Sequence, residues 1–347
     1  MSAITATAAR LHRNADRVFA DMSPDRPGCA AGAMKNGRIL WTGAFGSADL
    51  ELGLPITPDT VFNIASISKQ ITAFSVLLLA QEGRLSLDDP ARRYVPELGS
   101  YAAPVTIRML LHHTGGLADY MDSAEAAGIG PEQKLTAAQV LSFVGAMTAA
   151  DHPAGTAYDY SNTGYYLLSL VVERVSGSSM KSFAERRILQ PLGMDRSTIV
   201  DAYPAGIAGL ARGYAASDAG YRIDESLWEN TGDGQVHTTV GDLLSWARNL
   251  ETGAVGGVSL ARQMQEAGTL ADGTPLDYAS GLEIDAYRGT RTIGHGGSWA
   301  GYNGNLLLLP ERQLTVAILY NFEDPKMVER THALVDVFWD ATVPEGN

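Results

Sequence analysis

The spacing of apolar positions changes along the chain and predicts its elements. Over residues 6–22, apolar residues recur every three or four positions with charged residues between them, which predicts an amphipathic helix. Residues 30–34 and 38–46 then lie on either side of an Asn-Gly pair, which supplies the positive φ angles that a tight turn needs. We therefore predict a β-hairpin after the first helix.

Helical spacing dominates the middle of the chain. The apolar stretch over residues 67–80 ends near Gly83 and is interrupted by Thr72 and Ser75. A membrane span needs ~20 apolar residues, so this stretch predicts a buried helix and we expect no span. Further helices are predicted at residues 107–112, 136–147, 163–175, 180–189 and 240–250.

Strand patterns return near the C-terminus, at residues 293–295, 303–309 and 314–321. A last helix is predicted at residues 326–339. Strands at both ends with helices between them predict one sheet that is built from the two chain ends. We expect residues 1–70 and 251–347 to form this sheet region and residues 71–250 to form a mostly helical insertion. An active site is expected in the crevice between the two regions.

Composition and charge exclude several classes of protein. The chain has 347 residues, 45% of them hydrophobic, which excludes intrinsic disorder. Lys and Arg number 26 against 39 Asp and Glu, a net charge of −13, so we expect no nucleic-acid partner. Cys29 is the single cysteine, which excludes an intramolecular disulfide and a cysteine-rich metal site. No His-x-x-x-His or His-Glu-x-x-His pattern occurs, and we expect neither a metal nor another cofactor.

The N-terminal segment bears on localisation. It carries Arg10, Arg13, Asp16 and Arg17 where a signal peptide has an uninterrupted apolar stretch. We expect a cytoplasmic protein, or a periplasmic one if a leader has been removed.

Ser66 and Lys69 stand three residues apart at the start of the predicted helix 67–80. Side chains at this spacing share a helix face, so the lysine nitrogen can reach the hydroxyl. Serine is a weak nucleophile without an adjacent base, and lysine is a base only when its pKa is lowered, as burial and a helix N-terminus both do. Such a pair is also an ordinary helix start, and we interpret the second copy, Ser178 with Lys181, as a helix cap with a solvated lysine.

Tyr160 and Asn162 lie just before the predicted helix 163–175. A tyrosine oxygen near a serine-lysine pair can relay a proton to a leaving group, and an asparagine amide can hold the lysine and the substrate. By itself, Tyr-x-Asn is also a common loop tripeptide.

A third candidate motif begins at a short strand and comprises His295, Gly296, Gly297 and Ser298. Glycines on an edge strand let an extended substrate pair with the backbone, because no Cβ intrudes. The backbone N–H of Ser298 could join that of Ser66 in an oxyanion hole. By itself, the motif is also consistent with a tight turn at a strand end.

The ordered motifs S-x-x-K, Y-x-N and H-G-G resemble those of the serine β-lactamase and penicillin-binding-protein superfamily. The resemblance is closest to its class C β-lactamase-like branch, which also includes carboxylesterases, D-aminopeptidases and DD-peptidases. Residues 110–117 are similar to the family segment L-L-x-H-T-S-G-L, with Gly115 in place of the serine, and residues 232–239 resemble its glycine-rich turn. The similarity covers about residues 28–323.

The resemblance implies an α+β fold of the β-lactamase/transpeptidase type, in which helices flank an antiparallel sheet. It also implies an acyl-enzyme, with Ser66 as nucleophile, Lys69 as general base and Tyr160 as the residue that shares this proton and protonates the leaving group. Asn162 would position Lys69 and the substrate, and the residues 295–298 would bind substrate. How Lys69 and Tyr160 divide the role of base stays open.

His295 departs from the family pattern, because β-lactamases and penicillin-binding proteins usually carry lysine there to attract a substrate carboxylate. A neutral histidine forfeits a charge-assisted hydrogen bond of about 1.5–3 kcal/mol, so we expect poor activity on β-lactams. We expect a carboxylesterase on small uncharged esters. Alternatives are a D-amino-acid amidase or D-aminopeptidase, a weak β-lactamase or DD-peptidase, and a catalytically inactive binding module.

The expected partner is thus a small-molecule ester or amide, and the oligomeric state stays open. Three aromatic residues close to the motifs, Tyr120, Trp299 and Tyr302, could line an acyl pocket or belong to the core. The adjacent His112 and His113 point in different directions in regular structure, so we interpret them as a structural loop and not as a metal pair.

Overall fold

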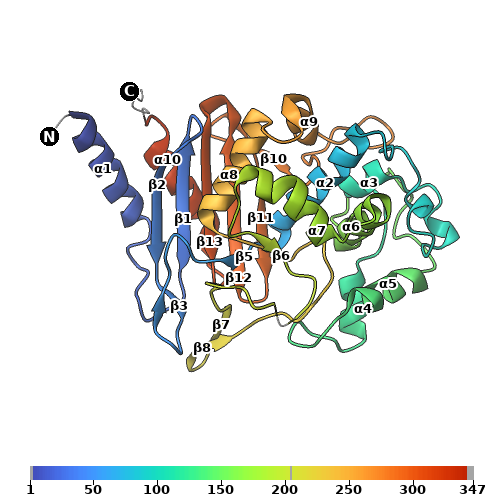
Figure 1. Ribbon diagram of the computed structural model, residues 1–347, viewed down its shortest axis with the longest axis horizontal. Coiled ribbons are helices and arrows are strands. Elements are labelled where there is room, and N and C mark those ends of the chain that lie inside the picture. The colour runs from blue at the N-terminus through green and yellow to red at the C-terminus, as the bar shows by residue number, and fades with distance from the viewer. Residues whose placement is uncertain (1–2, 204, 342–347) are drawn as a thin grey trace.

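A six-stranded antiparallel sheet stands at one side of the computed structural model, which describes residues 3–203 and 205–341 (Figure 1). Its strands follow the order β10-β11-β12-β13-β1-β2. They are β1 (Cys29–Lys35), β2 (Arg38–Phe45), β10 (Glu283–Tyr287), β11 (Thr290–Trp299), β12 (Tyr302–Leu309) and β13 (Leu314–Tyr320). Because β1 pairs with both β2 and β13, the N-terminal and C-terminal parts of the chain share one sheet, and the predicted α+β fold is confirmed.

The predicted hairpin is the β1–β2 pair. Lys35 pairs with Arg38 across the turn. Asn36 and Gly37 adopt φ angles of 51° and 69°, the left-handed values expected for a two-residue turn. This turn fixes the register of the N-terminal strands.

Helices cover both faces of the sheet. Alternate β1 residues face opposite sides: Ala30 and Met34 belong to the core that includes α8 (Val240–Thr252), whereas Ala31 and Ala33 belong to the core under α1 (Ala3–Arg17) and α10 (Met327–Phe338). Figure 1 shows α8 in front of the sheet, with α1 beside β2. Since helices cover both faces at the centre of the sheet, every residue of β1 and β13 is buried.

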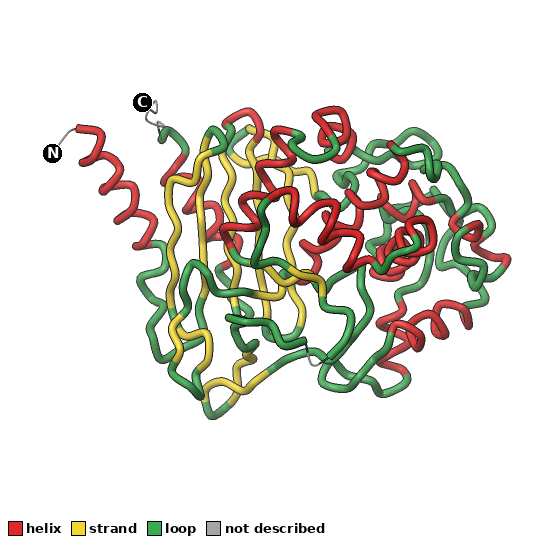
Figure 2. The backbone as a smooth tube through the Cα atoms, in the orientation of Figure 1, coloured by secondary structure: helices red, strands yellow, loops and turns green. Residues whose placement is uncertain are grey.

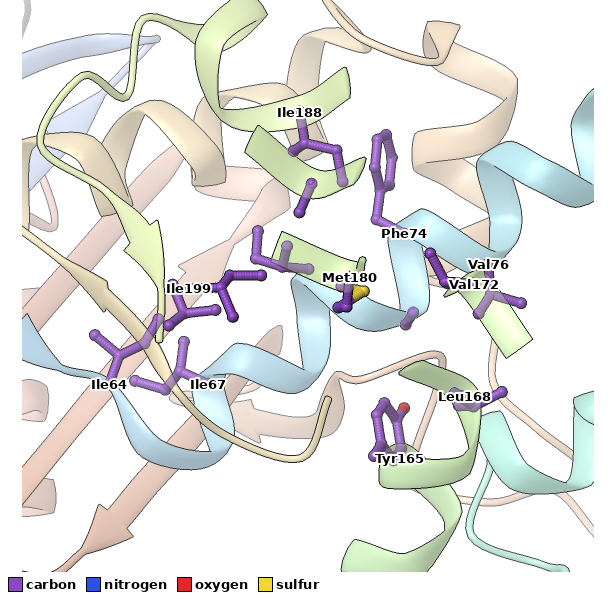
Figure 3. Packing of buried hydrophobic residues seen from close by; sticks show 14 of the residues in the cluster. Ile64, Ile67, Phe74, Val76, Tyr165, Leu168, Val172, Met180, Ile188 and Ile199 are labelled. Carbon is purple, nitrogen blue, oxygen red and sulfur yellow. The ribbon is translucent and has the colours of Figure 1, made fainter. Parts of the chain in front are cut away.

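A mostly helical part lies beside the sheet (Figure 2). At its centre α2 (Lys69–Gln81) is buried along residues 69–79 and packs against α6 (Asn162–Ser176), α7 (Met180–Ala184) and α9 (Gly257–Met264). Figure 3 shows this packing, with Phe74 and Val172 among its members. The remaining helices are α3 (Ile107–Leu111), α4 (Tyr120–Ala126) and α5 (Ala137–Ala146).

Short strands connect the two parts. β5 (Phe62–Asn63), β9 (Val236–Thr238) and β6 (Thr198–Ile199) form a three-stranded sheet, and β5 leads into the 3₁₀ turn η1 (Ala65–Ser68) that precedes α2. Two further pairs are β3 (Ser47–Asp49) with β4 (Leu54–Pro55) and β7 (Tyr214–Ser217) with β8 (Gly220–Ile223). Among the described helices, none is long and apolar enough to cross a membrane.

Several predicted bounds differ from the structure. The first helix ends at Arg17 and not at residue 22, because the chain continues in tight turns, such as the bond from Met22 N–H to the Phe19 carbonyl. The predicted helix 180–189 is α-helical only to Ala184 and ends in a π-helical turn. The predicted strand 293–295 is part of the ten-residue β11. The elements α4, α9 and β10 were not predicted.

Candidate active site

Ser66 lies in a tightly anchored turn. Ile64 and Ile67 on either side of it are buried in the core, where Figure 3 shows them close together, while Ser66 is partly exposed. Ala65 adopts a left-handed φ of 47°, which is strained for a residue with a Cβ, and its N–H donates to Asn63 Oδ1 at 2.8 Å. The turn therefore holds the Ser66 hydroxyl at the surface of a rigid core.

Lys69, the first residue of α2, is fully buried behind Ser66. Its Nζ donates to Ser66 Oγ at 3.1 Å, to Asn162 Oδ1 at 2.8 Å and to the backbone oxygen of Asp233 at 2.9 Å. Burial lowers the pKa of Lys69 to about 8, although the Asp233 and Asp119 carboxylates act in the opposite direction. The structure thus brings together the predicted pair Ser66 and Lys69.

These three contacts determine where the lone pair of a neutral Lys69 points. A neutral amine has two N–H donors and one lone pair. Asn162 Oδ1 and the Asp233 carbonyl oxygen can only accept hydrogen bonds, so they take the two N–H groups. The lone pair is left facing Ser66 Oγ, the arrangement that a general base for this hydroxyl requires.

Asn162 begins α6, and its amide orientation is fixed from the far side. The Asn162 backbone N–H and Nδ2 both donate to Asp119 Oδ2, at 2.8 and 3.0 Å. Nδ2 is therefore turned away from Lys69, and Oδ1 must face it. Asp119, which caps α4, was not singled out in the sequence, since its role depends on the meeting of two helix starts.

Tyr160 stands beside this pair in the loop before α6. Burial raises the pKa of Tyr160 well above its usual value, against a lowering by its hydrogen bond with Ser66. Its ring centroid lies 4.8 Å from Lys69 Nζ and 4.3 Å from that of His113. His113 Nδ1 accepts the Ser161 N–H at 3.0 Å, which ties the loop to the histidine ring. Tyr160 is consequently a neutral phenol within reach of Ser66.

The third motif approaches Ser66 through a glycine. A Cβ on Gly297 would lie 2.4 Å from the Ile64 carbonyl oxygen and 3.3 Å from the Ser66 nitrogen, so only glycine allows β11 so close to η1. Ser298 follows and lines the same cavity as Ser66. The position of Gly296 is roomier, because its Cβ would meet nothing closer than the Gly304 carbonyl at 4.0 Å.

His295 lies behind the cavity wall and not on it. The sequence suggests a substrate contact, but the ring is buried and does not line the cavity, because Tyr160 and Tyr278 pack against it at centroid distances of 6.0 and 5.8 Å. His295 Nδ1 donates to the Gly296 carbonyl, so Nε2 accepts from the Tyr278 hydroxyl at 3.1 Å. Burial lowers the pKa of His295 to about 4, and the ring is neutral at pH 7.

The cavity in front of Ser66 measures ≈ 230 Å³. Tyr160, Asn162 and Ser298 line it together with Ser66, whereas Gly296 and Gly297 do not. Its other walls are aromatic and polar, and none of the described residues that line it is Lys or Arg; the principal ones are Tyr120, Met121, Trp228, Trp299, Asn230, Asp233 and Gln235.

The three aromatic candidates have separate positions. Tyr120 and Trp299 line the cavity in front of Ser66. Trp299 also borders a second cavity of ≈ 460 Å³, which Tyr302 lines. Asp233 was missed: its Gly-Asp-Gly context resembles a family turn, but the sequence does not show that the turn meets Tyr120.

The second S-x-x-K copy is a structural helix start. Ser179, and not Ser178, caps α7 by accepting the Ser182 N–H. Lys181 is partly exposed, as expected for a solvated lysine, and its Nζ also donates to Glu185 Oε1 at 2.7 Å and to the Ile199 carbonyl at 2.9 Å. Unlike Lys69, Lys181 thus forms none of these hydrogen bonds with a serine.

Several known proteins are similar to this chain in sequence. A family profile described as Beta-lactamase matches residues 14–337. A D-aminopeptidase of Gluconobacter oxydans (strain 621H) is 28% identical over 301 residues, which cover 85% of this chain and 56% of that protein. Penicillin-binding protein 4* of Bacillus subtilis (strain 168) is 28% identical over 313 residues, or 86% of this chain and 69% of that protein. The chain thus spans little more than half the length of the matching D-aminopeptidase.

Solved structures share the fold of this chain. The octameric penicillin-binding protein homologue from Pyrococcus abyssi superposes with a TM-score of 0.82 at 27% identity, covering 95% of this chain and 76% of that chain. The D-amino acid amidase from Ochrobactrum anthropi SV3 reaches a TM-score of 0.80 at 22% identity, with 98% and 99% covered. The second likeness concerns the fold alone.

Proposed function

The chain belongs to the beta-lactamase family, and from this premise we propose that it is a serine hydrolase that works through an acyl-enzyme on Ser66. The observation that carries the proposal is the hydrogen bonding of Lys69. Two obligate acceptors hold its N–H groups, and the remaining position faces Ser66 Oγ at 3.1 Å. Complete burial favours the neutral amine that can use this position.

The proposed reaction has two halves. In acylation, Ser66 Oγ attacks the substrate carbonyl carbon while its proton passes to Lys69, and the bond to the leaving group then breaks as that group takes up a proton through Tyr160. In deacylation, water attacks the ester carbon and gives one proton to Lys69, the bond from this carbon to Ser66 Oγ breaks, the acid departs, and Ser66 Oγ takes up that proton. The backbone N–H groups of Ser66 and Ser298 are the proposed donors to the carbonyl oxygen in both halves.

The cavity favours small uncharged esters as substrates, which supports the hypothesis of a carboxylesterase. Without a Lys or Arg among its described lining residues, it offers no fixed positive charge to a substrate carboxylate. Its volume of ≈ 230 Å³ suits a short acyl group. Penicillins and peptides that end in a carboxylate are therefore expected to be poor substrates.

A D-amino-acid amidase or D-aminopeptidase is the second candidate. The observation in its favour is that similar proteins are named D-aminopeptidase, among them the one from Gluconobacter oxydans. The leaving amine of an amide depends more on protonation than the leaving alcohol of an ester does. A neutral Tyr160 is suited to supply this proton.

Ser66→Ala tests the proposed function. We expect loss of p-nitrophenyl acetate and butyrate hydrolysis by at least about 10³-fold with the thermal unfolding midpoint retained. Ser178→Ala is the matched control, since it changes the serine of the other S-x-x-K copy, and it should leave turnover intact. D-alanine p-nitroanilide and a chromogenic cephalosporin, measured alongside, rank the substrate classes.

Labelling with a fluorophosphonate separates an enzyme from a binding module. The wild-type protein should carry one adduct on Ser66 and the Ser66→Ala variant none. Folded wild-type protein that stays unlabelled and hydrolyses no member of the panel would favour the inactive binding module instead.

A further inference from the structure

The second cavity, which shares Trp299 with the active-site cavity, has a pair of polar side chains in its wall. Asn63 and His237 line it and are only 3% and 2% exposed. They stand opposite each other on β5 and β9, and one position further along the Ile64 N–H donates to the Val236 carbonyl. Hydrogen-bonded and non-hydrogen-bonded pairs alternate, so Asn63 and His237 form a non-hydrogen-bonded pair, whose side chains lie close together on one face.

His237 offers a hydrogen-bond acceptor. Its Nδ1 lies 3.1 Å from the Gln235 carbonyl oxygen, which can only accept, so Nδ1 carries the proton. Burial lowers the pKa of His237 to about 4, and the ring is neutral at pH 7. Nε2 consequently holds a lone pair, and no described residue donates to it.

Asn63 offers a hydrogen-bond donor beside this acceptor. Its Oδ1 accepts the Ala65 N–H at 2.8 Å, which fixes the amide orientation, and Nδ2 has no acceptor among the described residues. Some polar side-chain atoms of the interior are sealed off without a partner, but Asn63 Nδ2 and His237 Nε2 are not among them. Both atoms are therefore accessible from the cavity that their residues line.

The rest of the wall offers apolar surface and paired charges. The two charged residues of its described lining are Lys134, whose Nζ lies 2.8 Å from Glu229, and Glu225, which lies 3.8 Å from Arg212. The cavity volume of ≈ 460 Å³ lies in the range of small-molecule sites, about 300–1,000 Å³. The larger apolar side chains of the wall include Leu210, Leu227, Trp299 and Tyr302.

We propose that this second cavity binds a neutral aliphatic alcohol, with the hydroxyl at Asn63 and His237 and the carbon chain along the apolar wall. A hydroxyl oxygen can accept from Asn63 Nδ2 while it donates to His237 Nε2. Its single donor is then satisfied, whereas a carboxamide brings a second N–H for which the pair has no acceptor. A carboxylate has no proton to donate to His237, and an ammonium group has no lone pair for Asn63.

The proposed site adjoins the active-site cavity but is separate from it. Trp299 lines both cavities, whereas Ser66, Tyr160 and Asn162 are not among the described residues that line the second one. Binding of the alcohol thus requires no reaction at Ser66. The inference goes beyond the proposed hydrolysis, and each can fail without the other.

Two ligands with the same carbon chain test the hydroxyl on wild-type protein. 1-Hexanol can donate and accept, whereas its methyl ether 1-methoxyhexane can only accept, and a ligand-observed NMR titration at pH 7 gives Kd for each. We expect 1-hexanol to bind at least about threefold more tightly, as the additional hydrogen bond implies. The ether has the larger apolar area, so burial alone predicts the opposite order. Equal or tighter binding of the ether, or no binding of 1-hexanol, would overturn the proposal.

His237→Asn tests where the alcohol binds. The shorter amide can still donate to the Gln235 carbonyl, but the Nε2 acceptor is lost. We expect 1-hexanol to bind about three- to tenfold more weakly and the ether to change little. His12→Asn is the matched control, because it makes the same change at an exposed position of α1, outside the described lining of both cavities. Unchanged 1-hexanol binding in His237→Asn, or an equal loss in His12→Asn, would contradict the site.

Asn63→Asp should change which head group binds. The new carboxylate keeps an acceptor for the Ala65 N–H and replaces the donor by a second acceptor, so the ligand must donate twice. The affinity of hexylammonium relative to 1-hexanol should then rise at least about tenfold over the wild-type ratio. A gain of affinity cannot come from a poorly folded protein. A ratio that stays at the wild-type value would show that Asn63 does not contact the head group, and would overturn the proposal.

Discussion

Lys69 can act as a base only when it is neutral, and burial and charge oppose each other at its nitrogen. Burial brings the pKa of Lys69 to about 8, and the Asp233 and Asp119 carboxylates raise it against this effect. With such a value, roughly a tenth of the molecules hold the neutral amine at pH 7. The hydrolytic rate should therefore depend on pH in a defined direction.

We expect kcat/KM for p-nitrophenyl acetate to rise with pH, about tenfold per unit at first, and to level off above pH 8. The reason is that deprotonation of Lys69 converts the ammonium into the base. Initial rates at constant ionic strength between pH 6 and 9 measure this limb. A flat profile across that range would contradict Lys69 as the base.

Asp233→Asn should move this limb to lower pH. The ionised Asp233 carboxylate favours the charged form of Lys69, so its removal lowers the pKa of the amine. Asp122→Asn, which changes the same charge at an exposed position, should leave the limb in place. A shift toward higher pH in Asp233→Asn would show that the sign of this coupling is wrong.

At the residue scale, the sequence predicts those site residues whose spacing carries a motif. Ser66, Lys69, Tyr160 and Asn162 are brought together as predicted, although their catalytic roles stay proposals. Asp233 was missed because its surroundings come from α4 and from the turn before β9, which are far apart in the chain. The burial of His295 could not be predicted, since it depends on rings that pack from other segments.

At the scale of elements, the site depends on how closely β11 approaches η1. Gly297 stands opposite Gly304 in the sheet and faces the Ile64 carbonyl of the nucleophile turn. The first residue of β9 is tied to the residue that precedes η1 by the bond from the Ile64 N–H to the Val236 carbonyl at 3.0 Å. Both β11 and β9 therefore contact the segment that carries Ser66.

Gly297→Ala should displace the nucleophile turn. Its Cβ would meet a backbone oxygen at 2.4 Å, so the strand or η1 must move. We expect kcat/KM for p-nitrophenyl acetate to fall at least tenfold and the free energy of unfolding to fall by about 1–3 kcal/mol. Ester assays and denaturant unfolding measure the two effects.

Gly296→Ala is the control for this prediction. It adds the same methyl group one residue away, where the closest atom would be at 4.0 Å. Most of the activity and stability should remain. Equal damage from both variants would mean that the added side chain disturbs β11 itself and not its approach to Ser66.

Elements with strong local signals were predictable, and those that depend on neighbours were not. The Asn36-Gly37 turn specifies the β1–β2 hairpin by its own geometry. In contrast, β10 is a short strand with three of five residues exposed, and it exists because β11 provides its hydrogen bonds. The length of β11 was underestimated because glycines interrupt its apolar pattern.

At the scale of the whole molecule, the charge of the chain and the active-site cavity have the same sign. The sequence has a net charge of −13, and the cavity presents Asp233 with no Lys or Arg among its described lining residues. Both features attract cations and repel anions. An electrostatic effect on cationic substrates should then depend on salt.

We expect kcat/KM for alanine benzyl ester at pH 7 to fall about three- to tenfold when ionic strength rises from 0.01 to 0.15 M. Over this range the screening length shrinks from about 30 to about 8 Å, so the field of distant carboxylates no longer reaches the ammonium group. Benzyl propionate is neutral and should change little, which makes it the internal control. The Asp233→Asn variant should keep part of the salt dependence, since the other carboxylates remain. If salt affects both esters equally, the effect acts on the protein and not on the attraction of a cationic substrate.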